Sequence, residues 1–159
     1  MERLCEVPGI GADIACTIIA ELGLDMTVFG TAGRLCAWAK VAPATKQSGR
    51  RKARGKTGTG NPYLKSSLGQ AATGAAKTQT FLGERYRRLI KRMPKGKART
   101  AIAWSILMIV FFLLADPTAR YHDLGPDFYA RHLDTRRRTD QLVRQLQALG
   151  HTVTLAPAV

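Results

Sequence analysis

The chain has 159 residues, of which 45% are apolar, and this is enough for the core of one domain and excludes disorder along the whole length. Its 25 lysines and arginines outnumber 11 acidic residues, so the formal net charge is +14. That charge does not specify a fold, but it predicts a polyanionic partner, either nucleic acid or an anionic membrane surface. The three cysteines and three histidines are too scattered for a disulfide framework or a zinc site, so we expect no metal in this chain.

The first element, residues 1–25, predicts two helices joined by the turn Pro8-Gly9-Ile10-Gly11. This pattern looks like a helix-hairpin-helix DNA-binding element. Glycines lack a Cβ and let a turn approach a phosphate, while free N–H groups of the turn and of the next helix point at the anion. We therefore expect Gly9, Ile10 and Gly11 to contact the DNA backbone; the alternative is an ordinary helical hairpin.

Residues 43–61 differ from their surroundings, because glycine and proline punctuate a stretch almost without large apolar residues. We predict an exposed basic loop or irregular ribbon here. No acid occurs in residues 26–83, so the positive charge is uncompensated, and a phosphate backbone compensates it best. The candidate DNA-binding residues of this loop are Lys46, Arg50, Arg51, Lys52, Arg54 and Lys56.

Residues 62–115 predict three helices. Asn61 and Pro62 are typical of a helix start, and a second helix covers Phe81 to Arg92 with a basic outward face that includes the DNA-binding candidates Arg87 and Arg88.

The third of these helices, residues 95–115, ends in an uncharged stretch, residues 100–115. As a helix this stretch spans about 24 Å, short of a hydrocarbon core of about 30 Å. We therefore interpret it as a central core helix and expect no membrane partner. A small membrane protein with this helix as its span is the alternative.

The C-terminal residues 117–159 predict a connector, a helix capped by Asp134 and ended by Gly150, and a tail with a short strand at residues 152–155. The predicted fold class is mainly α: a helix-hairpin-helix element, a basic loop, and a helical bundle with one central apolar helix. We divide the chain into residues 1–25, 26–116 and 117–159.

Ser48 precedes a glycine inside the densest basic run. A serine hydroxyl is a weak nucleophile unless a base or nearby cations assist it. Lys46, Arg50 and Arg51 are suited to stabilising charge on a phosphate under attack. From these residues alone, a plain loop serine remains the alternative.

The order of motifs along the chain adds information. It begins with Val-Pro-Gly-Ile-Gly and continues with Ala42-Pro-x-Thr-x-Gln-Ser-Gly49, Gly60-Asn61, Phe81-Leu-Gly-Glu-Arg-Tyr-Arg-Arg-Leu89 and a basic-flanked apolar helix. This order resembles the C-terminal part of the insertion-sequence transposases of the "IS one-ten" family, also called one-sixteen and nine-oh-two. The resemblance covers roughly residues 1–150.

The resemblance implies a DNA recombinase of the bacterial cytoplasm, associated with the nucleoid, that acts on double-stranded DNA. Family members have an N-terminal RuvC-like domain with four acidic residues and Mg²⁺, and a C-terminal transposase domain whose serine forms a covalent link to DNA. A structured guide RNA directs target choice, and the assemblies are oligomeric. The family's serine-glycine motif aligns with Ser48-Gly49, so the resemblance makes Ser48 the candidate catalytic residue of this chain.

The chain departs from the family pattern in one respect. We find no counterpart of the acidic RuvC-like domain, and none of the 11 acids replaces it. We therefore expect no divalent-metal site in this chain, and interpret it as a truncated or fragmentary reading frame, either a remnant or one half of a split gene. The alternative function is a non-enzymatic nucleic-acid-binding module or an inactive transposase remnant.

Overall fold

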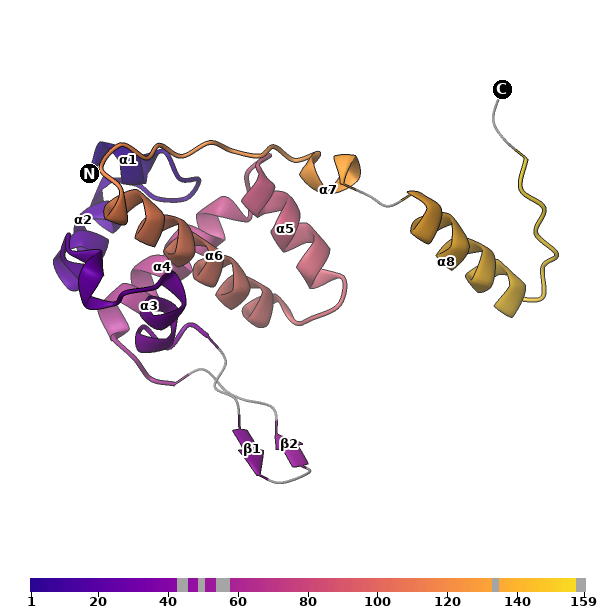
Figure 1. Ribbon diagram of the computed structural model, residues 1–159, viewed down its shortest axis with the longest axis horizontal. Coiled ribbons are helices and arrows are strands. Elements are labelled where there is room, and N and C mark those ends of the chain that lie inside the picture. The colour runs from indigo at the N-terminus through magenta and orange to yellow at the C-terminus, as the bar shows by residue number, and fades with distance from the viewer. Residues whose placement is uncertain (43–45, 49–50, 54–57, 133–134, 157–159) are drawn as a thin grey trace. The chain divides into compact units, whose positions relative to one another are not determined.

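A computed structural model describes residues 1–42, 46–48, 51–53, 58–132 and 135–156. The chain divides into two compact units, Met1–Pro126 and Asp127–Val159 (Figure 1). The prediction of a mainly helical protein with one apolar helix is confirmed. The first unit contains α1 (Glu2–Cys5), α2 (Ala12–Leu22), a 3₁₀ turn η1 (Met26–Val28), α3 (Ala32–Trp38), β1 (Lys46–Ser48), β2 (Arg51–Ala53), α4 (Pro62–Ala75), α5 (Phe81–Ile90) and α6 (Lys95–Ala115).

The apolar helix α6 lies at the centre of the first unit, where it packs against α1, η1, α3, α4 and α5 (Figure 1). Apolar side chains cover most of its circumference, as expected for a helix with neighbours on several sides. Its length and composition would also suit a membrane span, but 50% of its most apolar 18-residue window is buried inside the protein. The one hydroxyl buried on it, of Ser105, donates to the carbonyl oxygen of Ala101 at 3.0 Å.

The N-terminal pair of helices is present, with α1 and α2 joined by a turn and α2 packed on α4. Ala15, Ile18 and Leu22 form the buried face of α2, and Gly23 ends the helix at φ 71°. Because α1 has only four residues, the pair lacks a long first helix. Its identity as a DNA-binding helix-hairpin-helix stays a prediction.

Three side-chain caps explain where α3, α4 and α5 begin. Thr31, Asn61 and Thr80 each accept a hydrogen bond from a backbone N–H three residues later, at 3.3, 3.1 and 3.4 Å. These caps satisfy N–H groups that have no partner inside the helix. The prediction that Asn61 and Pro62 start a helix is confirmed.

The predicted loop or irregular ribbon, residues 43–61, contains a regular ribbon in its described part. Its described residues include two short antiparallel strands, paired in the register Lys46↔Ala53, Gln47↔Lys52 and Ser48↔Arg51. Residues 43–45, 49–50 and 54–57 lie outside the described part of the chain. Composition alone suggested an irregular segment because glycines interrupt both strand and helix patterns. In the structure, the short basic runs between the glycines pair with each other.

Residues 116–126 run across the first unit and are held to it by polar contacts. A single Arg3 Nη1 donates to three carbonyl oxygens, of Leu113, Asp116 and Ala119, at 2.7, 2.8 and 3.1 Å. Glu6 accepts from the N–H of Tyr121 at 3.0 Å and pairs with Arg120. These residues, which we predicted as part of a C-terminal connector, belong to the first unit.

The second unit contains α7 (Phe128–Arg131) and α8 (Thr135–Ala148). The predicted C-terminal helix is confirmed, and Gly150 follows it at φ 87°. Its proposed cap, Asp134, lies outside the described residues. The predicted tail strand is wrong for residues 152–155, which have no regular structure, because no neighbouring strand offers them hydrogen bonds within this unit.

Candidate nucleic-acid interface

The candidate nucleophile Ser48 is the last residue of β1, directly opposite Arg51 of β2. Residues opposite each other in an antiparallel pair are neighbours across the ribbon. Lys46 begins the same strand, and Lys52 pairs with Gln47. The ribbon therefore brings into one register four of the residues predicted from the sequence, whereas Arg50, Arg54 and Lys56 lie outside the described residues.

The two ends of the segment that carries this ribbon are fixed side by side on the first unit. A Cβ on Gly60, which has φ 56°, would lie 2.7 Å from the carbonyl oxygen of Ala39. Lys65 donates to the carbonyl oxygen of Gly58 at 2.7 Å, and Lys40 takes the left-handed conformation with φ 55°. The two ends of this segment, residues 43–61 and hereafter the basic segment, therefore lie next to each other on the helical body.

The glycine turn between α1 and α2 is built mainly for packing. Gly9 has φ 91°, and a Cβ on it would lie 2.1 Å from the carbonyl oxygen of Ala71 in α4. Ile10 is 4% exposed, and its N–H donates to the carbonyl oxygen of Val7 at 3.0 Å. We expected both glycines to give a phosphate access; the missing Cβ of Gly9 gives α4 access to the turn, and a contact of Gly9 with DNA stays a prediction.

Gly11 alone keeps the geometry expected for anion contact. It is exposed, a Cβ on it would meet nothing within 4 Å, and it begins α2 without a side-chain cap. The free N–H groups of the first turn of α2 therefore face outward. Asp13, exposed in the same turn, places a negative charge beside them and opposes an anion.

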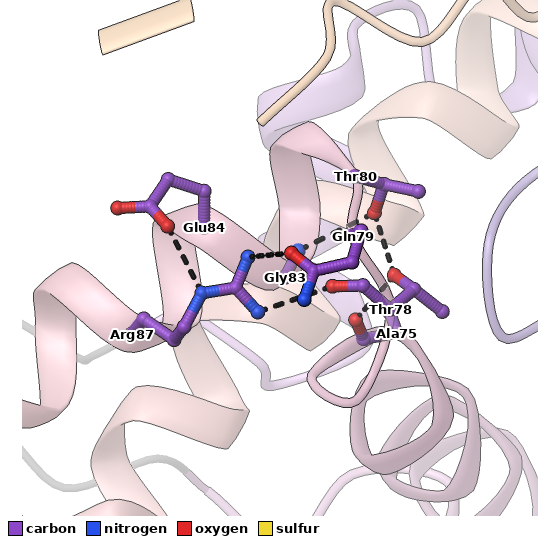
Figure 2. A network of polar contacts seen from close by, with 7 residues as sticks. All are labelled: Ala75, Thr78, Gln79, Thr80, Gly83, Glu84 and Arg87. Carbon is purple, nitrogen blue, oxygen red and sulfur yellow. Dashed lines mark hydrogen bonds and ion pairs between the residues drawn. The ribbon is translucent and has the colours of Figure 1, made fainter. Parts of the chain in front are cut away.

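Arg87, one of two candidates on α5, is engaged within the protein. Its Nε donates to Glu84 Oε2 at 2.9 Å, and its two Nη atoms donate to the carbonyl oxygen of Thr78 and to Gln79 Oε1 at 3.2 and 3.3 Å. Figure 2 shows these contacts closing the turn between α4 and α5. Arg87 therefore positions α5, while its neighbour Arg88 is exposed.

The same network explains the glycine of the Phe81–Leu89 motif (Figure 2). A Cβ on Gly83 would lie 2.1 Å from the carbonyl oxygen of Thr78. The hydroxyls of Thr78 and Thr80 lie 2.6 Å apart, and Thr78 also donates to the carbonyl oxygen of Ala75 at 2.8 Å. This motif is thus the helix α5, whose Gly83 lets the start of the helix pack closely against the turn that follows α4.

The acidic residues in the described part of the chain do not gather into a metal site. In the described ranges, no three side chains of His, Cys, Asp or Glu come together as possible ligands. Several acids instead accept hydrogen bonds that hold the fold together. Asp123, for example, accepts a hydrogen bond from the N–H of Phe81 at 3.1 Å at the start of α5. The described residues therefore do not fit Mg²⁺, and we derive no step through a metal in this chain.

Sequence reasoning missed two cations that the tertiary structure brings together. Lys65 of α4 and Arg99 of α6 line one open groove of about 570 Å³. Lys65 stands apart from the basic residues of the predicted loop, and Arg99 was not among the predicted DNA-binding residues. A 34-residue separation gives no periodic signal, so packing of the two helices was needed to reveal the pair.

Residues 1–87 match the model of the Transposase IS116/IS110/IS902 family. Because the match covers more than half of the chain, the protein belongs to this transposase family, for which DNA is the partner. The family predicted from the order of motifs is confirmed; that the chain corresponds to the C-terminal domain stays a prediction. No curated protein matches the chain, and no solved structure matches it.

Proposed function

We propose that this chain is a DNA-binding part of a cytoplasmic, nucleoid-associated insertion-sequence transposase in which Ser48 attacks a DNA phosphate. The observation that carries the proposal is the family match over residues 1–87, which includes Ser48 within the ribbon that pairs it with Arg51. Cations beside a serine stabilise the charge that develops on a phosphate under attack.

The proposed step is a transesterification. The Oγ of Ser48 forms a bond to phosphorus, the bond from phosphorus to one sugar oxygen breaks, and that oxygen takes up a proton as the serine hydroxyl loses one. No oxidant, reductant or water is consumed. A base for the serine proton and the family's Mg²⁺ come from its acidic domain. We propose that copies of this chain associate with one another and act together with that domain in an assembly guided by an RNA.

A covalent-adduct assay tests this function. The chain would be mixed with a separately expressed acidic domain from the family, the element's guide RNA, Mg²⁺ and end-labelled duplex DNA carrying the element's ends, and then resolved under denaturing conditions. We expect a protein–DNA adduct with the unaltered chain and with Gln47→Ala, and none with Ser48→Ala. An adduct that persists in Ser48→Ala would show that the nucleophile lies elsewhere.

A second candidate is a nucleic-acid-binding module without catalysis. The described residues favour it in one respect, because their acids form no metal site. This function predicts equal DNA affinity for Ser48→Ala and the unaltered chain, and no adduct from either when the acidic domain is present. An adduct from the unaltered chain would rule it out.

A further inference from the structure

An open groove of about 570 Å³ runs between α4 and the first turns of α6. From α4 it is lined by residues spaced to share one helical face, and from α6 by residues spaced in the same way. Three of the lining residues, Gly69, Gly96 and Ala103, are small and leave room for a ligand. The full lining is Val41, Lys65, Ser66, Gly69, Gln70, Thr73, Gly96, Arg99, Thr100 and Ala103.

We propose that this groove binds the sugar–phosphate backbone of one nucleic-acid strand. The inference rests on the proposed function and adds a binding site that lies outside the serine ribbon.

The charge of the groove suits a polyanion. Lys65 and Arg99 line it, and none of its lining residues is acidic. Arg99 is exposed, and none of the described residues pairs with its guanidinium. Arginine and lysine at such a groove form charge-assisted hydrogen bonds with phosphate oxygens.

Polar groups along the groove suit a sugar–phosphate chain. Thr73 and Thr100 donate to the carbonyl oxygens of Gly69 and Gly96 at 2.8 and 3.1 Å, which fixes their side chains at the groove. Exposed Ser66 and Gln70 lie one helical turn apart on α4. Because the two threonine hydroxyls use their protons within the helices, Ser66 and Gln70 are the polar groups that supply donors, and hydroxyl and amide donors make many of the contacts between proteins and nucleic-acid backbones.

The position of the groove favours a polymer over a small metabolite. The groove is open, so a strand can enter and leave it. Val41, at the start of the basic segment, lines it, and Lys65 also holds Gly58 at the segment's far end. A strand bound by the basic segment is therefore close to a second set of cations on the helical body.

A pair of glycine variants tests the groove without removing a charge. A Cβ at Gly69 or at Gly33 would meet nothing within 4 Å, and both residues lie inside helices. Gly69→Leu fills the groove, whereas Gly33→Leu adds the same side chain at an exposed position of α3. Leucine also has a higher helix propensity than glycine, so neither change strains its helix.

Affinity for a fluorescein-labelled single-stranded DNA oligonucleotide would be measured by anisotropy at several salt concentrations. We expect Gly69→Leu to weaken binding about tenfold or more, which corresponds to loss of the phosphate contacts of the groove, and Gly33→Leu to change it less than about twofold. Arg99→Gln should reduce the magnitude of the slope of log affinity against log salt by about 0.7, the value for one contact to a single strand, while Arg34→Gln at an exposed position of α3 should leave it unchanged.

The outcomes separate this inference from the proposed function. If the unaltered chain binds no nucleic acid, the proposed function fails. If it binds and Gly69→Leu matches Gly33→Leu, only the groove inference is overturned. Competition by a free mononucleotide at lower concentration than by the oligonucleotide would also overturn it. If circular dichroism shows that Gly69→Leu is unfolded, the Arg99→Gln slope decides the result.

Discussion

Gly9 and Ala71 meet backbone to backbone, because a Cβ on Gly9 would lie only 2.1 Å from the carbonyl oxygen of Ala71. The turn that we first interpreted as a phosphate contact is thus also the point at which α2 docks on α4. On the other side of this contact, a Cβ on Gly74 would lie 3.2 Å from the Cα of Gly9. Two glycines on separate elements therefore set the distance between them.

Gly9→Ala should destabilise the protein strongly. The new Cβ would collide with the backbone of α4 and would also be strained at φ 91°, so we expect a loss of at least about 3 kcal/mol in the free energy of unfolding. Gly11→Ala, which meets open space, should cost about 1 kcal/mol or less as a weaker helix cap. Urea unfolding measures both; equal losses would contradict the packing role of Gly9.

Arg87→Lys should loosen the turn between α4 and α5. Lysine keeps the charge near Glu84 but cannot also reach Thr78 and Gln79 as the planar guanidinium does, so we expect a loss of about 1–2 kcal/mol. The matched change Arg92→Lys, at an exposed position, should be neutral. If thermal unfolding shows no difference between the two variants, the network in Figure 2 does not stabilise the turn.

Arg3→Ala should free the chain that follows α6. One Nη1 atom donates hydrogen bonds to the carbonyl oxygens of Leu113, Asp116 and Ala119. Without it, these oxygens would have to accept hydrogen bonds from water. We expect faster amide hydrogen exchange at residues 117–123 and a lower melting temperature. Arg34→Ala, at an exposed position of α3, is the control and should change neither quantity. Unchanged exchange in Arg3→Ala would show that other contacts hold this segment.

Cys36 should resist alkylation while Cys5 and Cys16 react. Burial raises the pKa of the Cys36 thiol to about 11 from an ordinary value near 9, whereas the other two thiols are exposed. At pH 8 iodoacetamide should therefore label two cysteines in the native chain and three in urea, as counted by mass spectrometry. Labelling of Cys36 at the rate of Cys5 would contradict its burial.

The same pKa shift sets a pH dependence of stability. The unfolded thiol ionises near its ordinary pKa, and the folded thiol only near pH 11. The contribution of Cys36 is therefore fully present below pH 9 and is lost as the pH rises from about 9 to 11. Cys36→Ala should remove this part of the alkaline decline when urea unfolding is repeated across that range. A decline that Cys36→Ala leaves unchanged would point to other groups.

Binding to nucleic acid should be strongly salt-dependent. If six or more phosphates are neutralised, affinity should fall by a factor of about 10³ between about 50 and 200 mM salt. A double-logarithmic plot of affinity against salt gives the number of contacts. A slope near zero would contradict an electrostatic interface and would leave the net charge of +14 without a role in binding.

The sequence by itself determined most of the helices and the family. Capping residues such as Asn61, terminating glycines such as Gly23 and the apolar run that ends α6 are read from neighbours along the chain, because caps and periodicity act over one or two helical turns. Short motifs in a fixed order were enough to predict the family, and the charge count was enough to predict a polyanionic partner.

Only the tertiary structure decided what the individual residues of those motifs touch. It placed Gly9 against α4, turned Arg87 toward Thr78, and gathered Lys65 and Arg99 at one groove. Such contacts join residues far apart in the chain, and no spacing rule connects them before the helices pack. A glycine beside a phosphate and a glycine beside a helix look the same in sequence, since both need only the absence of a Cβ.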